Sequence, residues 1–321
     1  MSTRLILSIF FGCGSLLSNA QTNNAFLANY LYNYHYINPA YIGNNEKTTI
    51  GIASRHQWVG FDGSPKTHAL NAFSNLKSLD EKLAIGGIFI NDKIGPENNF
   101  YATADVAYHL FFDEAILSFG IRSGISSFSL NLSSLEINND LDSKLLGNTR
   151  RIVPVIGSGL YFYTHNYFIG FSIPQLMQYK LNTVSNSQSE VKRVYQFAGG
   201  HISTIHSNVS LKLTGFVEYS NESPMELSFA SSFLIHEKLW LGTFIRSSKN
   251  IGLMTQWVYS NTLSLGYIFE FPFGISNSPS FYGTHELTLS LKFDNEEDKI
   301  MNMKIRKKKS QGRRHWKSRH F

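Results

Sequence analysis

The feature of this sequence that most constrains its fold is a repeated alternation of apolar and polar residues. Residues 209–219 read Val-Ser-Leu-Lys-Leu-Thr-Gly-Phe-Val-Glu-Tyr, so almost every odd position is apolar and most even positions are polar or charged. Because the side chains of a β-strand point alternately to its two faces, this period predicts a strand with one apolar face. The same alternation recurs in residues 100–110, 262–271 and 284–293.

Extended along the chain, the alternation predicts fourteen strands. Single-chain barrels of the bacterial outer membrane have an even number of strands, and strands of about 9–11 residues cross a bilayer at a tilt. We therefore expect an all-β fold, a transmembrane antiparallel up-and-down β-barrel over residues 48–293. The expected strands are 48–57, 67–76, 83–91, 100–110, 115–129, 152–163, 167–173, 193–205, 209–219, 225–235, 238–246, 251–259, 262–271 and 284–293.

The composition agrees with a surface that faces lipid. Aromatic residues make up 14% of the chain and charged residues only 16%, whereas about a quarter of the residues of a soluble protein are charged. No window offers the ~20 consecutive apolar residues that a membrane-spanning helix needs. A soluble β-sandwich or solenoid stays open as an alternative, because its strands also alternate. Aromatic residues at expected strand ends favour the barrel, where they form interfacial girdles: Trp58, Tyr108, Trp257 and Tyr259.

The N-terminus has the features of a cleaved signal peptide. Arg4 precedes an apolar run, and Ser18 and Ala20 have the spacing that a signal peptidase recognises. We therefore expect residues 1–20 to be removed. Cys13 is the one cysteine of the chain and would be lost with them, which excludes disulfides and cysteine-bound metals from the mature protein. The alternative is a lipoprotein in which Cys13 becomes the acylated first residue.

The links between the expected strands give a second, independent indication of a barrel, because outer-membrane barrels have short periplasmic turns and longer external loops. Links after even-numbered strands are brief, and several links after odd-numbered strands are long. This pattern predicts that residues 130–151 and 174–192 are external and that both termini are periplasmic. The odd-numbered links near Asn221 and Ser248 are short and do not fit the pattern.

Two segments lie outside the expected barrel. Residues 21–47 are rich in Asn and Tyr, and we expect them to be plug-like or to lie in the periplasm. Residues 294–321 begin acidic and end strongly basic, so most of the net charge of +6 is local to this tail. Such a charge block is usually a solvated extension or an interaction arm. A periplasmic arm would meet an acidic protein surface or anionic headgroups rather than nucleic acid.

No catalytic or metal-binding signature stands out. The 11 histidines are scattered, and none has a metal-binding spacing such as His-Glu-x-x-His. We therefore expect no enzyme activity, no cofactor and no metal. A barrel enzyme with a Ser/His site at the membrane face stays open, although a serine lies near almost any histidine of this chain.

Two short segments have compositions that the alternation does not explain. Residues 37–43 read Ile-Asn-Pro-Ala-Tyr-Ile-Gly, and their proline and glycine predict a rigid bend before the first strand. Residues 55–67 run from the first strand into the first external loop, where two glycines and a proline predict a tight turn. The structural residues of the two segments are Asn38, Pro39, Tyr41, Gly43, Gly60, Gly63 and Pro65. The candidate partner-binding residues are Arg55, Gln57, Trp58, Phe61 and Asp62.

Parity along the first expected strand assigns its side chains to the two faces. With Ile50 and Ile52 toward lipid, the interior receives Thr49, Ala53, Arg55 and Gln57. The inward choice is favoured because an arginine at mid-depth on the lipid face would cost about 2–4 kcal/mol. We expect Arg55 to bond carboxylates or carbonyls of the wall or plug, such as Asp105 or Glu218.

The turn in residues 55–67 presents two aromatic rings. Trp58 continues the lipid-facing row by parity and is typical of a girdle residue. Phe61 is the better candidate anchor for a protein partner, because aromatic anchors dominate protein interfaces. A hairpin tip with no partner stays open as the alternative.

These two segments resemble signature stretches of the PorP/SprF family of type IX secretion system membrane proteins. The family stretches read roughly Ile-Asn-Pro-Ala-Tyr-x-Gly and Arg-x-Gln-Trp-x-Gly-Phe-x-Gly-x-Pro-x-Thr. Residues 159–163, 167–176 and 283–286 are also similar to family stretches, and the five matches follow the family's order. The matches extend from the mature N-terminus to the last strand.

The resemblance implies an outer-membrane component of the type IX secretion machinery. Such a barrel would assist the secretion or surface anchoring of large, adhesin-like cargo that carries a C-terminal sorting domain. The implied partners are this cargo and other periplasmic or outer-membrane components, and family members are also linked to gliding motility. A passive or substrate-specific outer-membrane porin stays open as the alternative, and a barrel enzyme is the least favoured.

Overall fold

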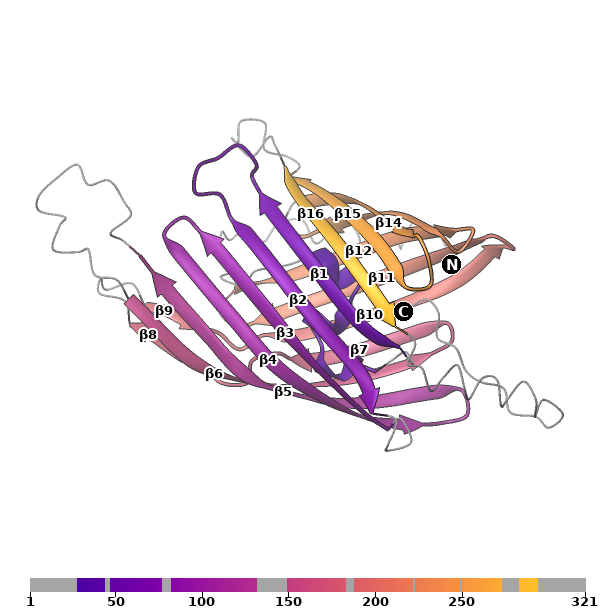
Figure 1. The fold of residues 1–321 in the computed structure, drawn as a ribbon, viewed down its shortest axis with the longest axis horizontal. Helices are drawn as coiled ribbons and strands as arrows, with labels where there is room; N and C mark the ends of the chain where they lie inside the picture. The colour runs from indigo at the N-terminus through magenta and orange to yellow at the C-terminus, as the bar shows by residue number, and fades with distance from the viewer. Residues whose placement is uncertain are drawn as a thin grey trace, which may run out of the picture.

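Fourteen antiparallel strands close into a barrel in the computed structural model of the chain (Figure 1). The structure describes residues 28–43, 47–76, 82–131, 149–182, 188–221, 223–248, 250–272 and 283–293. Barrel strands that follow one another along the chain are neighbours in the wall, and β1 pairs with β16 to close it. The expected fold class is therefore confirmed.

The strands begin and end close to where the alternation of side chains predicts. The wall consists of β1 (Thr48–Gln57), β2 (Lys66–Leu76), β3 (Leu83–Ile94), β4 (Glu97–Phe111), β5 (Ala115–Leu130), β6 (Thr149–Thr164), β7 (Tyr167–Ile173), β10 (Tyr195–His206), β11 (Val209–Ser220), β12 (Ser223–Ile235), β13 (Leu239–Arg246), β14 (Asn250–Val258), β15 (Leu263–Pro272) and β16 (Thr284–Phe293). The sequence did not predict the separate hairpin of β8 (Tyr179–Asn182) and β9 (Gln188–Val191).

The wall is uneven in height. Strands β5 and β6 have 16 residues each, whereas β13 has 8 and β14 has 9. The wall extends farthest on the side of β4 to β6, where the β8–β9 hairpin also lies (Figure 1). The girdle residues named from the sequence, Trp58, Tyr108, Trp257 and Tyr259, all have exposed rings.

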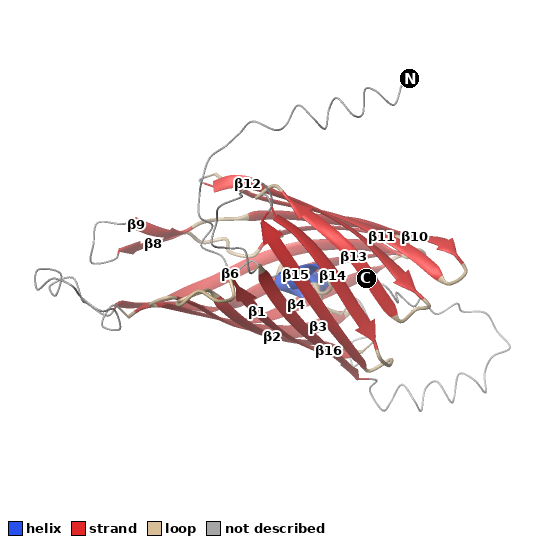
Figure 2. Cartoon of the chain, turned by 90° about the horizontal axis from the view of Figure 1, so that it is seen from above, coloured by secondary structure: helices blue, strands red, loops and turns tan. Residues whose placement is uncertain are grey.

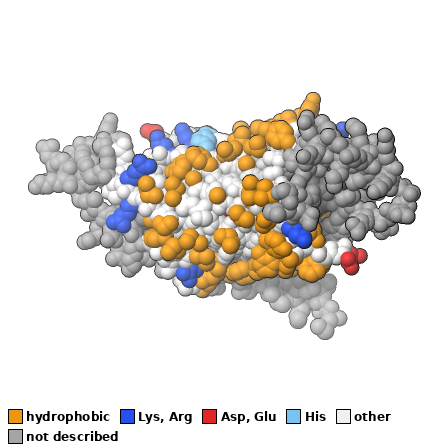
Figure 3. Space-filling view, turned by 60° about the horizontal axis from the view of Figure 1, so that its bottom comes forward, with side chains coloured by type: hydrophobic (Ala, Val, Ile, Leu, Met, Phe, Trp, Pro, Cys, Tyr) orange, Lys and Arg blue, Asp and Glu red, His pale blue; other side chains and the backbone are white. Residues whose placement is uncertain are grey.

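The barrel is apolar outside and polar inside. Ile52, Leu70 and Phe89, on three adjacent strands, are exposed on its outer face, while Arg55 and Asn71 are buried on its inner face. Orange apolar side chains spread over the middle of the visible wall, and charged side chains lie toward its ends (Figure 3). This distribution is the one expected of a barrel whose outer face contacts the hydrocarbon of a lipid bilayer. Among the described residues, no helix is long and apolar enough to cross a membrane.

A short N-terminal segment, residues 28–43, fills part of the barrel and is called the plug below. It forms three 3-10 helices, η1 (Ala28–Leu31), η2 (Tyr34–Tyr36) and η3 (Pro39–Tyr41). Figure 2 shows these helices inside the wall. All but two of the sixteen plug residues are buried. The plug therefore forms the main buried core of the barrel together with inward-facing residues of the wall.

Candidate functional site

The start of the plug is held by a carboxylate of the last strand. Glu286 accepts hydrogen bonds from the backbone N–H of Ala28 (N to Oε2, 3.0 Å) and of Asn29 (N to Oε1, 2.8 Å). These two N–H groups open the first helix of the plug, where helical donors have no partner within the helix. Because Glu286 is fully buried, this contact satisfies groups that water does not reach.

Two arginines neutralise the carboxylates beside the plug. Arg55 donates to Glu286 (Nη1 to Oε2, 3.2 Å) and to Glu270 (Nη2 to Oε2, 3.0 Å), and Arg246 donates to Glu270 (Nη1 to Oε1, 3.1 Å). All four side chains are at most 5% exposed. Two positive and two negative charges therefore form one buried network across β1, β13, β15 and β16.

The inward orientation of Arg55 and its bonds to wall carboxylates are confirmed, but the two carboxylates named for it, Asp105 and Glu218, are wrong. Its partners are Glu286, directly opposite on β16, and Glu270 on β15. Asp105 instead binds Arg122, and Glu218 accepts from Gln196 (2.8 Å). The reason is barrel closure, because the pairing of β1 with β16 brings residues 231 apart in the chain into contact.

A second buried network holds the middle of the plug. Arg122 donates to Asp105 (Nε to Oδ1, 2.9 Å; Nη2 to Oδ2, 2.7 Å) and also to the plug carbonyls of His35 (2.7 Å) and Tyr36 (3.2 Å). The His35 ring lies between Asp105 (Nε2 to Oδ2, 2.7 Å) and the Asn71 amide (Nδ1 to Nδ2, 3.1 Å). This geometry is that of a neutral imidazole that donates to Asp105 and accepts from Asn71.

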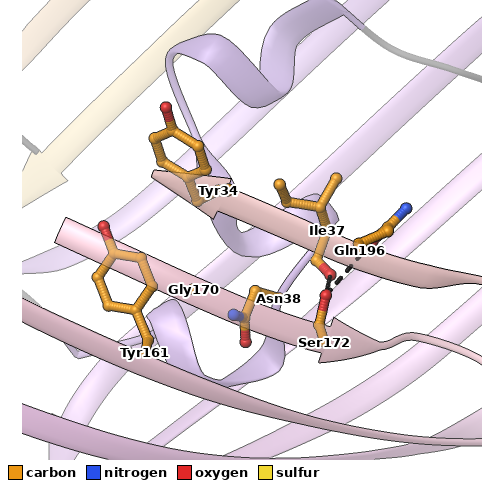
Figure 4. A pocket seen from close by; sticks show the side chains of 8 residues that line it. Tyr34, Ile37, Asn38, Tyr161, Gly170, Ser172 and Gln196 are labelled. Atoms are coloured by element: carbon orange, nitrogen blue, oxygen red, sulfur yellow. Dashed lines mark hydrogen bonds between the residues drawn. The ribbon is translucent and has the colours of Figure 1, made fainter. Parts of the chain in front are cut away.

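Asn38 connects the plug to β6 and β7, on the side of the barrel away from Arg55 and Glu286. Its Oδ1 accepts from the backbone N–H of Ala40 (2.9 Å), and its Nδ2 donates to the carbonyls of Leu160 on β6 (2.9 Å) and Phe171 on β7 (3.3 Å). Figure 4 shows its side chain lying against these strands. Asn38 also caps the helix that Pro39 begins. The bend predicted for this motif is therefore a helix start fixed to the wall.

Glycines in the wall let the plug backbone approach closely. A Cβ atom at Gly120 of β5 would overlap the backbone of Pro39 and Ala40, and one at Gly159 of β6 would overlap the Asn38 side chain. The motif glycine at the end of the plug, Gly43, has a φ of 77°, a conformation that favours glycine. These positions explain why a small residue recurs in strands that otherwise carry larger side chains.

Aromatic rings fill the space between the plug and the wall. The Tyr34 ring lies 4.7 Å from that of Phe168, and Tyr41 packs edge-on against Tyr161 at 5.5 Å. The amine of Lys212 lies 5.4 Å from the centre of the Tyr34 ring. The remaining gap beside Tyr34 and Tyr161 (Figure 4) is too narrow to admit a water molecule. Where it is described, this part of the lumen is packed rather than open.

The β1–β2 hairpin tip, residues 58–65, is the second candidate region. It is closed by a hydrogen bond from the Gln57 N–H to the Pro65 carbonyl (3.0 Å). Gly60 and Gly63 have φ values of 101° and 73°, as the predicted tight turn requires. Trp58 also has a positive φ, 48°, so it begins the turn rather than continuing the strand.

The candidate partner-binding residues do not lie on one surface. Trp58 and Phe61 are 47% and 39% exposed at the tip, and Asp62 is exposed beside them. Arg55 is only 4% exposed and belongs to the buried network at the plug. Gln57 is half-buried and marks the boundary between the two regions.

Sequence reasoning missed most of the ionisable residues that join the plug to the wall. These residues are His35, Arg122, Arg246, Glu270 and Glu286. One signal was present in the alternation, because Arg122, Glu270 and Glu286 occupy inward positions of strands whose outward positions are mostly apolar. In the described part of the chain, no three His, Cys, Asp or Glu side chains are arranged to hold a metal ion.

Comparisons with known proteins identify the family of this chain. The model of the family described as "Type IX secretion system membrane protein PorP/SprF" matches residues 19–291. The comparison with curated proteins found no match.

Three solved structures illustrate the likeness to other barrels. The outer membrane protein Omp33 of Acinetobacter baumannii is 9% identical, with a TM-score of 0.42 over 78% of this chain and 99% of that one. The toluene transporter TbuX of Ralstonia pickettii is 10% identical, with a TM-score of 0.49 over 80% and 92%. The toluene transporter TodX of Pseudomonas putida is 8% identical, with a TM-score of 0.46 over 85% and 95%. These low values carry no argument about what this chain does.

The family match runs from the N-terminal region through the plug and nearly to the end of β16, and it includes both motif segments. The chain therefore belongs to the PorP/SprF family of type IX secretion system membrane proteins and is an integral β-barrel of the outer membrane.

Proposed function

We propose that this barrel is a closed, non-catalytic holding component of the type IX secretion system. It would assist the secretion or surface anchoring of large cargo proteins that carry a C-terminal sorting domain. The observation that carries the proposal is the plug, which is fixed on several sides by hydrogen bonds and buried charges. A general porin needs an open polar lumen, whereas a holding component is compatible with a filled one.

The hairpin tip is the proposed docking point for cargo. Its rings are exposed, and aromatic side chains supply much of the binding free energy at protein interfaces. The tip also lies close to the plug network along the chain. Gln57, whose N–H closes the tip, comes two residues after Arg55 on β1. A partner that binds the tip would therefore bind close to the charged contacts that hold the plug.

Surface display of cargo in a Phe61→Ala strain tests the docking proposal. Phe112→Ala is the matched control, because Phe112 is 59% exposed but lies in the turn between β4 and β5, at the opposite end of the barrel. Display would be measured by labelling intact cells and normalised to the amount of folded barrel. We expect Phe61→Ala to reduce display and Phe112→Ala to leave it unchanged. Equal display in wild type and Phe61→Ala would refute docking at this tip.

Cargo and machinery partners are proposed only as classes. The barrel would contact sorting-domain cargo together with periplasmic or outer-membrane components of the apparatus. Proteins that co-purify with wild type in mild detergent, and that are lost with Phe61→Ala, would identify the cargo-side partner. Proteins retained by both would belong to other surfaces of the barrel.

A further inference from the structure

The outer face of the barrel has a row of basic side chains near the hairpin tip. His285 of β16 pairs with His56 of β1, His56 pairs with Lys66 of β2, and Lys66 pairs with Lys93 of β3. Each pair consists of residues directly opposite on neighbouring strands. Inward-facing residues next to them in sequence, such as Arg55, are buried, so the row faces outward.

This row marks the edge of the apolar belt. One step toward the middle of the membrane, Ser54 of β1 contacts both His56 and His68 (Oγ to ring nitrogen, 3.1 Å each). The next outward positions on β1, β2 and β3 are Ile52, Leu70 and Phe89, all strongly exposed. The order from the rim inward is therefore basic, then polar, then apolar. It is the order of phosphates, glycerol or sugar, and acyl chains in a lipid leaflet.

The two lysines lie directly opposite each other on β2 and β3. Like charges directly opposite on adjacent strands destabilise a sheet unless an anion lies between them. Among the described residues, no carboxylate forms an ion pair with Lys66 or Lys93. Asp62 of the hairpin tip accepts from the Gly63 N–H (3.0 Å), and the inward-facing Asp92 accepts from Thr67 (2.6 Å). The arrangement is that of a site for an external anion.

We propose that this row binds the phosphate groups of the anionic glycolipid of the outer leaflet, the lipid A type. The row lies at the barrel end that has the longer links, which is the external end in outer-membrane barrels. Lysine stems can follow the apolar wall while their amines reach the phosphate level. Charge-assisted bonds from the amines would hold the phosphates, and the imidazoles would add donors. This inference is independent of the proposed cargo function.

Lipid retention by a Lys66→Gln/Lys93→Gln variant tests the proposal. The matched control is Lys82→Gln/Lys238→Gln, which removes two exposed lysines at the opposite end of the barrel. Each full-length protein would be purified in a non-ionic detergent and titrated with bisphosphorylated lipid A, with the same lipid after phosphate removal, or with inorganic phosphate. Bound lipid would be counted by native mass spectrometry, and folding would be checked by heat-modifiable gel migration.

We expect wild type and the control to retain bisphosphorylated lipid A, and the Lys66/Lys93 variant to bind it about tenfold or more weakly, since each lost charged bond contributes on that order. The phosphate-free lipid should bind wild type and the variant equally weakly. Equal retention of lipid A by the folded variant and wild type would overturn the proposal. So would equal binding of the two lipids, or displacement of lipid A from the row by millimolar inorganic phosphate.

Discussion

The two motif segments of this chain differ in their burial and in their hydrogen bonds. The plug motif, residues 37–43, is buried and bonded to both the wall and its own backbone, whereas the hairpin tip, residues 58–65, is largely exposed and bonded mainly to itself. Both stretches read as family signatures, so a shared signature does not imply a shared role. The plug stretch is explained by packing, whereas packing does not explain the exposed rings of the tip, for which we propose a partner.

Breaking the plug network should have the largest effect. Glu286→Gln removes the charge that balances Arg55 and weakens the acceptor of two plug N–H groups. Breaking a buried ion pair on one side typically costs about 3–5 kcal/mol. We expect a lower unfolding midpoint in urea, followed by the loss of the heat-modifiable gel band. Glu97→Gln, at an exposed position of β4, is the control. Equal midpoints for the two variants would contradict the role assigned to Glu286.

Asn38→Ala should have the next largest effect. The variant leaves the Ala40 N–H and two strand carbonyls without the amide that now bonds them. An unsatisfied buried polar group costs about 1–3 kcal/mol. The same urea titration would measure the loss, with Asn208→Ala in an exposed turn as the control. A stability equal to wild type would mean that Asn38 does not hold the plug.

Changes at the hairpin tip should separate the two regions further. Phe61→Ala removes an exposed ring, and surface changes of this kind usually alter stability by no more than about 0.5 kcal/mol. Trp58→Ala should act mainly on insertion or stability, because the exposed Trp58 ring, although it begins the turn, lies next to the end of β1, where we expect the membrane interface. The fraction of each variant that reaches the heat-modifiable form would be compared. If Phe61→Ala destabilised the barrel as much as Asn38→Ala, the contrast between tip and plug would fail.

The smallest perturbation is a topology test. It does not change the plug or the hairpin tip, but it determines which side of the membrane the tip faces. Cysteines at Ser134 and Asn186 should react with an impermeant reagent on intact cells, while one at Ser78 should not. These three positions lie outside the described residues. The reverse labelling would put the hairpin tip and its rings in the periplasm, where they could not meet surface cargo.

The sequence predicted the wall better than its contents, and β1 shows why. Its bounds, residues 48–57, and the inward side of Arg55 follow from an alternation that is local and repeats every second residue. The partners of Arg55 do not, because they depend on which strand closes the barrel and at what register.

The candidate site was harder to predict for a related reason. The plug has no period, so its sequence indicates a bend at Pro39 but not three helices or their contacts. The alternation places Glu270 and Glu286 on the inner face, but it does not distinguish them from the other inward polar residues of β15 and β16. Arg55 pairs with both glutamates, and Arg246 pairs with Glu270. These pairs form only because the closed barrel brings the strands together.

The central claim is that the plug closes the barrel, and single-channel recording tests it most directly. The purified wild-type protein would be inserted into planar lipid bilayers and compared with the Glu286→Gln variant under the same voltage and salt. We predict no steady open-channel conductance for wild type. For the variant we predict transient channel openings, which occur when the plug leaves its place in the barrel. A steady, porin-like conductance of the wild-type barrel would contradict the claim.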